Sequence, residues 1–128
     1  MTKTVENSVL DAALDRIKNS CTQISCCHPP TPTTYASAAA NGGKCLAITD
    51  ISGADFTGPE DGTSGRKITV GQKSSVEVST TGSAEHFVLL NSTSTLIMYI
   101  TDVSGPQEIT DGNTMTFNSW AIEIADPT

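Results

Sequence analysis

The C-terminal third of the chain places its hydrophobic residues in short runs that alternate with polar ones. Two dense apolar runs, residues 87–90 and 96–100, are separated by the small polar side chains of residues 91–95. A short polar loop between two apolar runs is typical of a β-hairpin. We therefore predict two antiparallel strands joined by a turn at residues 91–95.

The last hydrophobic run, residues 120–125, has the two-residue period of a half-buried strand. Its predicted core-facing side chains are Trp120, Ile122 and Ile124. Glu123 lies between them and is predicted to face water. A shorter run at residues 114–117 follows an Asp-Gly-Asn turn sequence. Neither run has the length or the 3.6-residue period of a helix.

Residues 8–18 have the pattern of an amphipathic helix. The apolar stripe at i, i+3 and i+4 spacing consists of Val9, Leu10, Ala13, Leu14 and Ile17. Asn7 or Ser8 is predicted to cap the helix, and Asp11 completes a loose capping box. The stripe is interpreted either as a docking surface for a partner or, as we favour, as a plug at one end of the β structure.

Further short strands are predicted at residues 22–27, 45–51, 66–70 and 75–80. The proline-rich residues 28–35 and the glycine-rich, acidic residues 55–65 are interpreted as irregular loops. Short strands at regular spacing favour an antiparallel β-sandwich or jelly roll with one short N-terminal helix over a βαβ fold. We expect an N-terminal arm and helix at residues 1–20, and a single β-sandwich domain at residues 21–128.

The amino-acid composition limits the class of protein but does not indicate a particular reaction or ligand. The 128 residues suit one domain, and the low share of charged residues, 16%, with abundant Ser, Thr and Gly, suits short strands and many turns. A net charge of −7 argues against a nucleic-acid partner, because phosphate binding needs clustered Lys and Arg. No apolar stretch is long enough to cross a membrane, and the N-terminal residues lack a secretory cleavage pattern. We expect folding in a cytosol.

Four cysteines and a histidine are the residue types that bind zinc. Cys21 and Cys26 approach one zinc knuckle, but no second pair follows. Cys26 and Cys27 are predicted to point to opposite faces of a strand, so at most one of them joins a given site. The metal candidates are therefore Cys21, Cys26, His28 and Cys45. We favour the alternative that the cysteines are buried free thiols and that the chain binds no metal and no cofactor. In a reducing compartment we also expect no disulfide at Cys45.

No catalytic residue is assigned from the sequence. Residues 55–65 match neither a phosphate-binding loop nor a calcium loop. His86 stands beside Glu85 at the start of an apolar run and is predicted to be a packed or edge histidine. No nucleophile-elbow sequence is present. We expect that the chain is not an enzyme.

Residues 96–103 are apolar on both faces of the predicted strand. One face carries Leu96, Met98 and Ile100, and the other carries Ile97, Tyr99 and Val103. A strand that is buried on both sides is covered by a second element beyond the core. We expect that element to be the N-terminal helix or another subunit. In the second case the chain would form an oligomer.

Four blocks of the sequence carry a resemblance to a known group of proteins. They are residues 55–59 (DFTGP), 64–70 (SGRKITV), 82–90 (GSAEHFVLL) and 120–127 (WAIEIADP). In these blocks the chain resembles small tailed-bacteriophage proteins that are encoded among virion structural genes. It departs from them at residues 26–35, where relatives tend to have one Cys and a shorter link.

The resemblance implies a virion component, assembled in the host cytoplasm, with no cofactor. Within that class we expect a capsid decoration or cement protein that bridges subunits of the major capsid protein and contacts its own copies. The alternatives are a neck, tail or fibre-adaptor component and a receptor- or glycan-binding module. Nucleic acid and membrane are not expected partners. The predicted contact regions are residues 1–18, 28–35 and 55–65.

Overall fold

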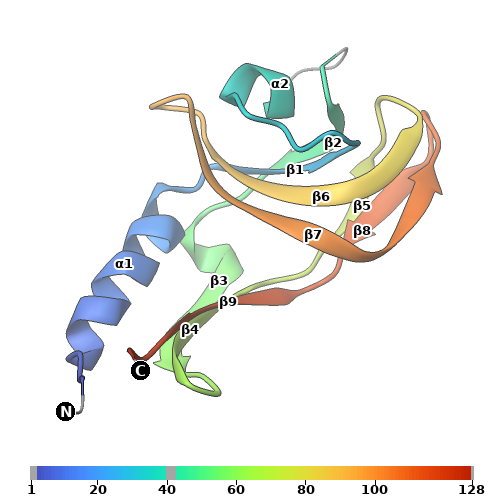
Figure 1. Ribbon diagram of the computed structural model, residues 1–128. Coiled ribbons are helices and arrows are strands. Elements are labelled where there is room, and N and C mark those ends of the chain that lie inside the picture. Colours follow the sequence, from blue (N-terminus) through green and yellow to red (C-terminus); the bar gives the residue numbers. More distant parts are fainter. Residues whose placement is uncertain (1–2, 40–42, 128) are drawn as a thin grey trace.

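The fold is mainly β, with one long helix near the N-terminus (Figure 1). The computed structural model describes residues 3–39 and 43–127. Within these ranges the strand ladders are antiparallel and form three sheets. The predicted fold class, mainly β with one N-terminal helix, is confirmed, and the arrangement is consistent with a β-sandwich.

The largest sheet has the strand order β2–β1–β6–β7. Its strands are β1 (Gln23–Cys27), β2 (Cys45–Asp50), β6 (Gly82–Asn91) and β7 (Leu96–Ile109). The second sheet, in the order β3–β4–β9, contains β3 (Phe56–Asp61), β4 (Gly65–Val70) and β9 (Trp120–Ala125). The third sheet pairs β5 (Lys73–Glu77) with β8 (Thr114–Phe117). The helical segments are α1 (Asn7–Ser20), α2 (Tyr35–Ala39) and the single turn η1 (Gly53–Asp55).

Six of the predicted strands are present as β1, β2, β4, β5, β8 and β9. The predicted strand at residues 75–80 is shifted toward the N-terminus, to Lys73–Glu77. In β9 the predicted alternation is confirmed, because Ile122 is buried and Glu123 is exposed. The Glu123 carboxylate accepts hydrogen bonds from the backbone N–H groups of Ser64 and Thr63, at 2.7 and 3.0 Å. These bonds lower the pKa of Glu123 and hold the turn between β3 and β4 against β9.

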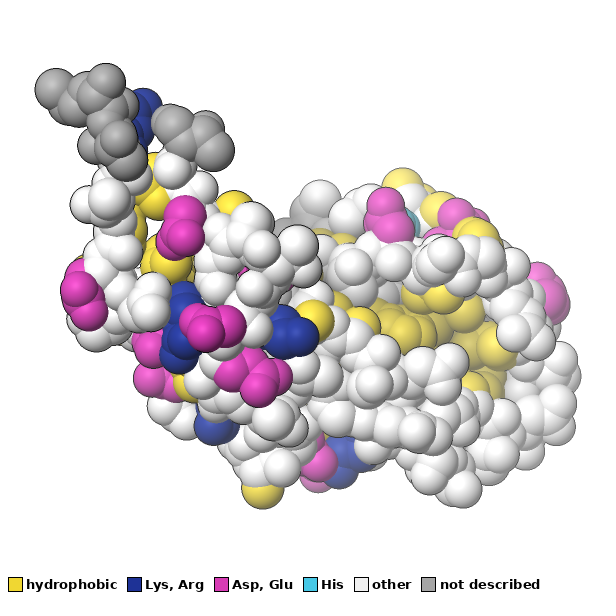
Figure 2. Space-filling view, turned by 90° about the horizontal axis from the view of Figure 1, so that it is seen from below, with side chains coloured by type: hydrophobic (Ala, Val, Ile, Leu, Met, Phe, Trp, Pro, Cys, Tyr) yellow, Lys and Arg dark blue, Asp and Glu magenta, His cyan; other side chains and the backbone are white. Residues whose placement is uncertain are grey.

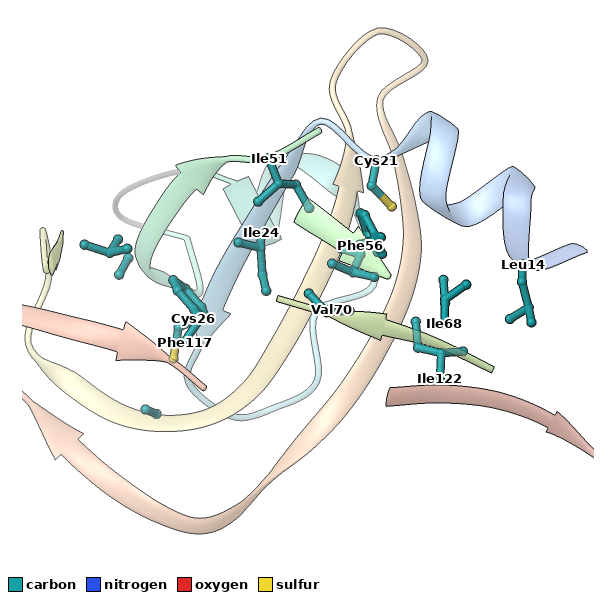
Figure 3. Packing of buried hydrophobic residues seen from close by; sticks show 14 of the residues in the cluster. Leu14, Cys21, Ile24, Cys26, Ile51, Phe56, Ile68, Val70, Phe117 and Ile122 are labelled. Atoms are coloured by element: carbon teal, nitrogen blue, oxygen red, sulfur yellow. The ribbon is translucent and has the colours of Figure 1, made fainter. Parts of the chain in front are cut away.

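Side chains from the three sheets meet in one main core (Figure 3). Ile24 of β1 and Ile68 of β4 are buried there, and the Phe117 ring of β8 packs edge-on against Phe87 of β6, with centroids 4.9 Å apart. A two-stranded sheet such as β5–β8 is marginal in water by itself. Its place in the fold therefore depends on Phe117 and on Val76, which β5 contributes to the same core.

The N-terminal helix α1 packs on the second sheet and not on β7 (Figure 1). Leu14 is fully buried and Leu10 nearly so, whereas Val9 from the same stripe is 60% exposed. On the same side of the helix, Asp11 accepts two hydrogen bonds from the Arg66 guanidinium of β4, at 2.8 and 3.2 Å. The interpretation of the helix as a plug at one end of the β structure fits this packing.

The predicted helix cap is wrong. Glu6 occupies the N-cap position with extended backbone, and its side chain makes no capping hydrogen bond among the described residues. Asp11 does not reach back to the helix start, because Arg66 holds its carboxylate. Arg66 also pairs with Asp61 at 2.7 Å, and Asp11 and then Asp61 raise the pKa of Arg66.

Residues 55–65 were predicted to be an irregular loop, and the structure corrects this. They contain the end of η1, all of β3 and the start of β4, which pair as a hairpin. Gly58 and Pro59 lie at a break in the β3–β4 register, and Gly58 has a φ of 101°. Proline is tolerated at a bulge of an edge strand, because no ladder hydrogen bond is needed from it there. The Gly-Pro pair therefore marks a bulge inside a strand.

The predicted hairpin at residues 87–100 is confirmed, and it is longer than predicted. Asn91 pairs with Leu96, and the Asn91 side chain accepts hydrogen bonds from the backbone N–H groups of Thr93 and Ser94. Strand β7 then continues to Ile109 across a wide bulge at residues 103–106. The sequence Ser-Gly-Pro in that bulge resembles a strand end.

The expected cover over β7 is only partly correct. A second, smaller cluster lies on the outer face of the large sheet, beneath α2, and Ile97 and Ile100 pack against it. On the other face, Met98 packs against the main core. The second element is therefore α2, a helix that sequence reasoning missed, and not the N-terminal helix. Tyr35 fixes α2 on the sheet by donating its hydroxyl proton to Gln23, at 2.9 Å.

Leu14 tests whether α1 belongs to the core. We expect Leu14→Ala to lower the free energy of unfolding by about 2–5 kcal/mol, because it removes a fully buried side chain and leaves a cavity. The control is Val9→Ala on the same helix, which should change that free energy by less than about 0.5 kcal/mol. Urea denaturation measures both. Equal effects of the two variants would contradict the packing of α1.

Candidate functional site

The four cysteines are free and buried within the described residues. Cys26 and Cys27 face opposite sides of the large sheet, as predicted, because Cys26 belongs to the main core and Cys27 to the cluster beneath α2. Burial raises the pKa values of the Cys21, Cys26 and Cys45 thiols to about 12. A thiol binds metal as the thiolate, so this environment opposes metal binding.

His28 is also turned away from a shared metal site. Its Nδ1 lies 2.7 Å from the Pro29 carbonyl oxygen and its Nε2 lies 3.3 Å from the Gly43 carbonyl oxygen. Both ring nitrogens therefore face hydrogen-bond acceptors of the backbone. In the described part of the chain, no group of three or more His, Cys, Asp or Glu side chains converges in a way that would hold a metal ion. The structure does not bring Cys21, Cys26, His28 and Cys45 together as one site.

His86 has partners that sequence reasoning did not identify. It pairs across the ladder with Asp102 of β7, and its Nδ1 lies 2.9 Å from the Asp102 Oδ1 atom. Its Nε2 lies 3.5 Å from the hydroxyl of Thr31, in the proline-rich loop. The order hydroxyl, imidazole, carboxylate is that of a nucleophilic triad. The β6–β7 register, which shifts between Leu89 and Leu90, places the two residues opposite each other.

The surroundings of His86 do not complete such a triad. The Asp102 side chain is 87% exposed, whereas the orienting acid of a triad is buried. The Thr31 hydroxyl is at the outer limit of hydrogen-bond distance. His86 itself is buried, so the interactions tie β6, β7 and the proline-rich loop together. The prediction of a packed histidine agrees with this placement.

The three predicted contact regions have different environments. Helix α1 uses Leu10 and Leu14 inside the fold, and residues 1–2 lie outside the described residues. Pro32 in the loop at residues 28–35 is buried, although its neighbours Thr31 and Thr33 are exposed. Residues 55–65 are mostly strand, with an exposed turn at residues 63–64. Each region therefore anchors one or two side chains in the fold and leaves most of its described residues exposed or partly exposed.

Besides Val9 of α1, the large hydrophobic side chains that are exposed in the described ranges lie on β7. Leu96 is 46% exposed and Tyr99 is 37% exposed. The Tyr99 ring lies beside Trp120 of β9, with centroids 5.8 Å apart. Strand β7 is the last strand of its sheet, so its outer edge has no partner strand among the described residues. An open edge with exposed hydrophobic side chains is a ready interaction surface.

No family model matches this chain, and no curated protein or solved structure matches it significantly. Among the helices of the described residues, none has the length and apolar character needed to span a membrane. The candidate site therefore rests on the geometry of this chain alone.

The buried thiols predict a loss of stability in alkaline solution. In the unfolded chain a thiol loses its proton near pH 9, whereas the folded-state pKa of Cys21 is about 12. Below pH 9 both states keep the proton. Between pH 9 and 12 only the unfolded state releases it, so stability falls by about 1.4 kcal/mol per pH unit for each such thiol.

The measurement is the free energy of unfolding, from urea titrations at several pH values between 8 and 12. Cys21→Ala should show a shallower decline than the unchanged protein above pH 9, because one titrating group is removed. Comparing the two slopes cancels the titration of Tyr and Lys. Identical slopes would show that Cys21 does not titrate as its burial requires.

Proposed function

We propose that this chain is a structural subunit of a tailed-bacteriophage particle that binds other virion proteins through the β7 side of its large sheet. The observation that carries the proposal is the open outer edge of β7 with the exposed side chains of Leu96 and Tyr99. The four sequence blocks that resemble phage virion proteins supply the biological setting.

An open edge such as that of β7 suits binding for a physical reason. Soluble proteins usually protect edge strands with Lys, Pro or inward-pointing charges. Residues 96–101 of β7 contain none of these. Burial of Leu96 and Tyr99 in an interface contributes about 25 cal/mol per Å² of apolar surface removed from water. In a symmetric particle the same modest contact is repeated in many copies.

Within the particle, our first choice is a capsid decoration or cement protein that bridges subunits of the major capsid protein. The net charge of −7 suits an outer surface that does not adhere to DNA. The arrangement of His86 gives no complete catalytic group, and this supports a binding role over an enzymatic one. A neck, tail or fibre-adaptor component and a receptor- or glycan-binding module are the competing assignments.

Particle labelling tests the proposal. Intact virions are labelled with gold-tagged antibody to this protein, and gel densitometry gives the copy number. We expect label over the head, at on the order of hundreds of copies, as lattice-wide decoration requires. Label confined to the neck or tail at low copy number would reject decoration and favour an adaptor or receptor-binding role. Absence of the protein from purified particles would reject the structural role.

A surface substitution tests whether β7 forms the contact with other virion proteins. Leu96→Lys should reduce occupancy on particles that lack the protein by about tenfold, because it places a charge in the buried contact. The matched control is Ser74→Lys, which puts the same charge on an exposed position of β5 outside the predicted contact regions. Occupancy is measured by densitometry after adding each purified variant to the particles. Equal occupancy of the two variants would show that the β7 edge is not the contact.

A further inference from the structure

A groove runs along β7 on the side of the second and third sheets. It consists of three adjoining hollows of about 270, 380 and 150 Å³. The first two share Phe87, Val103 and Asn118, and the last two share Gln107 and Ile109. Figure 2 shows a hollow with hydrophobic side chains at its floor in the right half of the view. The three hollows therefore adjoin one another between Trp120 and Asn113.

The groove lies between two strands that follow each other in the chain but do not pair. A short turn at residues 110–113 joins β7 to β8. Consecutive antiparallel strands with a short turn usually form a hairpin. Here β7 ends the large sheet and β8 pairs only with β5 among the described strands. The groove thus lies between two strands that each have an edge without a partner strand among the described residues.

The charge around the groove has one sign. Residues 74–128 contain seven Asp or Glu and no Lys or Arg, so they hold the whole net charge of the protein. Asp102 lines one end of the groove and Glu108 lines the other, and both side chains are exposed. Salt bridges to Lys or Arg occur in the other half of the molecule, at Arg66 and Lys73. An incoming cationic group would meet two exposed carboxylates here, of which Asp102 also contacts His86.

The groove is lined by both hydrophobic and hydrogen-bonding side chains, which suits a bound segment in extended conformation. Phe87, Val103, Ile109 and Met115 offer hydrophobic surface, and Gln107, Thr114, Thr116 and Asn118 offer hydrogen-bonding groups. Successive side chains of a strand point to opposite sides. One side of a bound strand would therefore meet the hydrophobic floor, and the other would face the solvent and the acidic rim.

We propose that this groove binds an extended, basic segment of a partner protein, which lies along β7 and pairs with it outside the bulge at residues 103–106. Backbone hydrogen bonds to β7 on either side of the bulge supply affinity, and alternate hydrophobic and cationic side chains supply specificity. The acidic rim attracts the segment and sets its register. The proposal deepens the proposed function by naming the chemistry of its partner. It rests on the chain being a binding subunit, but not on its place in a virion.

The experiment uses the purified, full-length protein and a capped seven-residue peptide of sequence KVKVTVK, labelled with a fluorophore. Binding is followed by fluorescence anisotropy at about 50 and 300 mM salt. We expect saturable binding in the micromolar range, weakened at the higher salt concentration. The matched peptide EVEVTVE should show no saturable binding. NMR amide shifts caused by the basic peptide should map to β7, β8 and the start of β9.

Variants locate the binding. Asp102→Asn combined with Glu108→Gln should lower the affinity for the basic peptide by about tenfold, because both rim charges are lost. The control combines Asp50→Asn with Asp126→Asn, which removes two exposed charges outside the groove, and should change affinity less than about twofold. Thr116→Tyr, at an exposed position in the groove wall, should block binding without changing the net charge.

Three outcomes would overturn the proposal. The first is absence of saturable binding of KVKVTVK up to about 1 mM. The second is equal weakening by the groove pair and the control pair, which would indicate attraction to net charge alone. The third is tighter binding of a peptide with the sequence of residues 1–7, which would make the occupant a second copy of this chain. Particle labelling is independent of each outcome, so a failure here is distinguishable from failure of the virion assignment.

Discussion

Burial of apolar side chains in one shared core is the interaction on which the rest of this structure depends. The β5–β8 and β3–β4–β9 sheets are small, and sheets of this size gain stability mainly by packing against another layer. Phe117 and Val76 bring the two-stranded sheet to the core, and Ile68 and Ile122 bring the three-stranded sheet. The large sheet supplies the opposite wall. Each smaller sheet is thus held by a few side chains, and the spaces between sheets remain as grooves.

The large sheet is covered on both faces, but unequally. The main core covers one face, and the five-residue helix α2 covers only part of the other. Strand β7, at the end of this sheet, therefore combines an apolar sequence with incomplete cover and an open edge. An edge of this kind is either an aggregation hazard or a binding surface. The acidic side chains along β7 and the wide bulge at residues 103–106 both oppose uncontrolled pairing of copies of this chain.

The reactive side chains of this structure, the cysteine thiols and the two histidines, serve to hold the fold together. Thiols that share their surroundings with Ile24 and Leu89 stay protonated at neutral pH, because burial penalises the thiolate. His28 interacts with backbone carbonyl groups, and His86 joins two strands to the proline-rich loop. Binding surfaces, by contrast, follow from the strand edges and from the separation of charge along the chain.

The sequence by itself determined the fold class, most strand positions and the inward face of β9. These follow from local periodicity, since alternation along a strand reflects which side is buried. The opposite directions of Cys26 and Cys27 followed from the same rule. Local reasoning failed at Gly58-Pro59 and at residues 103–106, because a turn and a bulge use the same residue types and differ only in whether a neighbouring strand continues the ladder.

Only the tertiary structure decided how distant segments meet. Arg66 takes Asp11 away from its expected capping role, and α2 covers β7 where α1 was expected. The contact between His86 and Asp102 depends on the register of the β6–β7 hairpin, which shifts between Leu89 and Leu90. The groove between β7 and β8 exists because their two sheets are held apart by the shared core. Each of these features depends on which side chains pack across the molecule, and a one-dimensional pattern of residues does not contain that information.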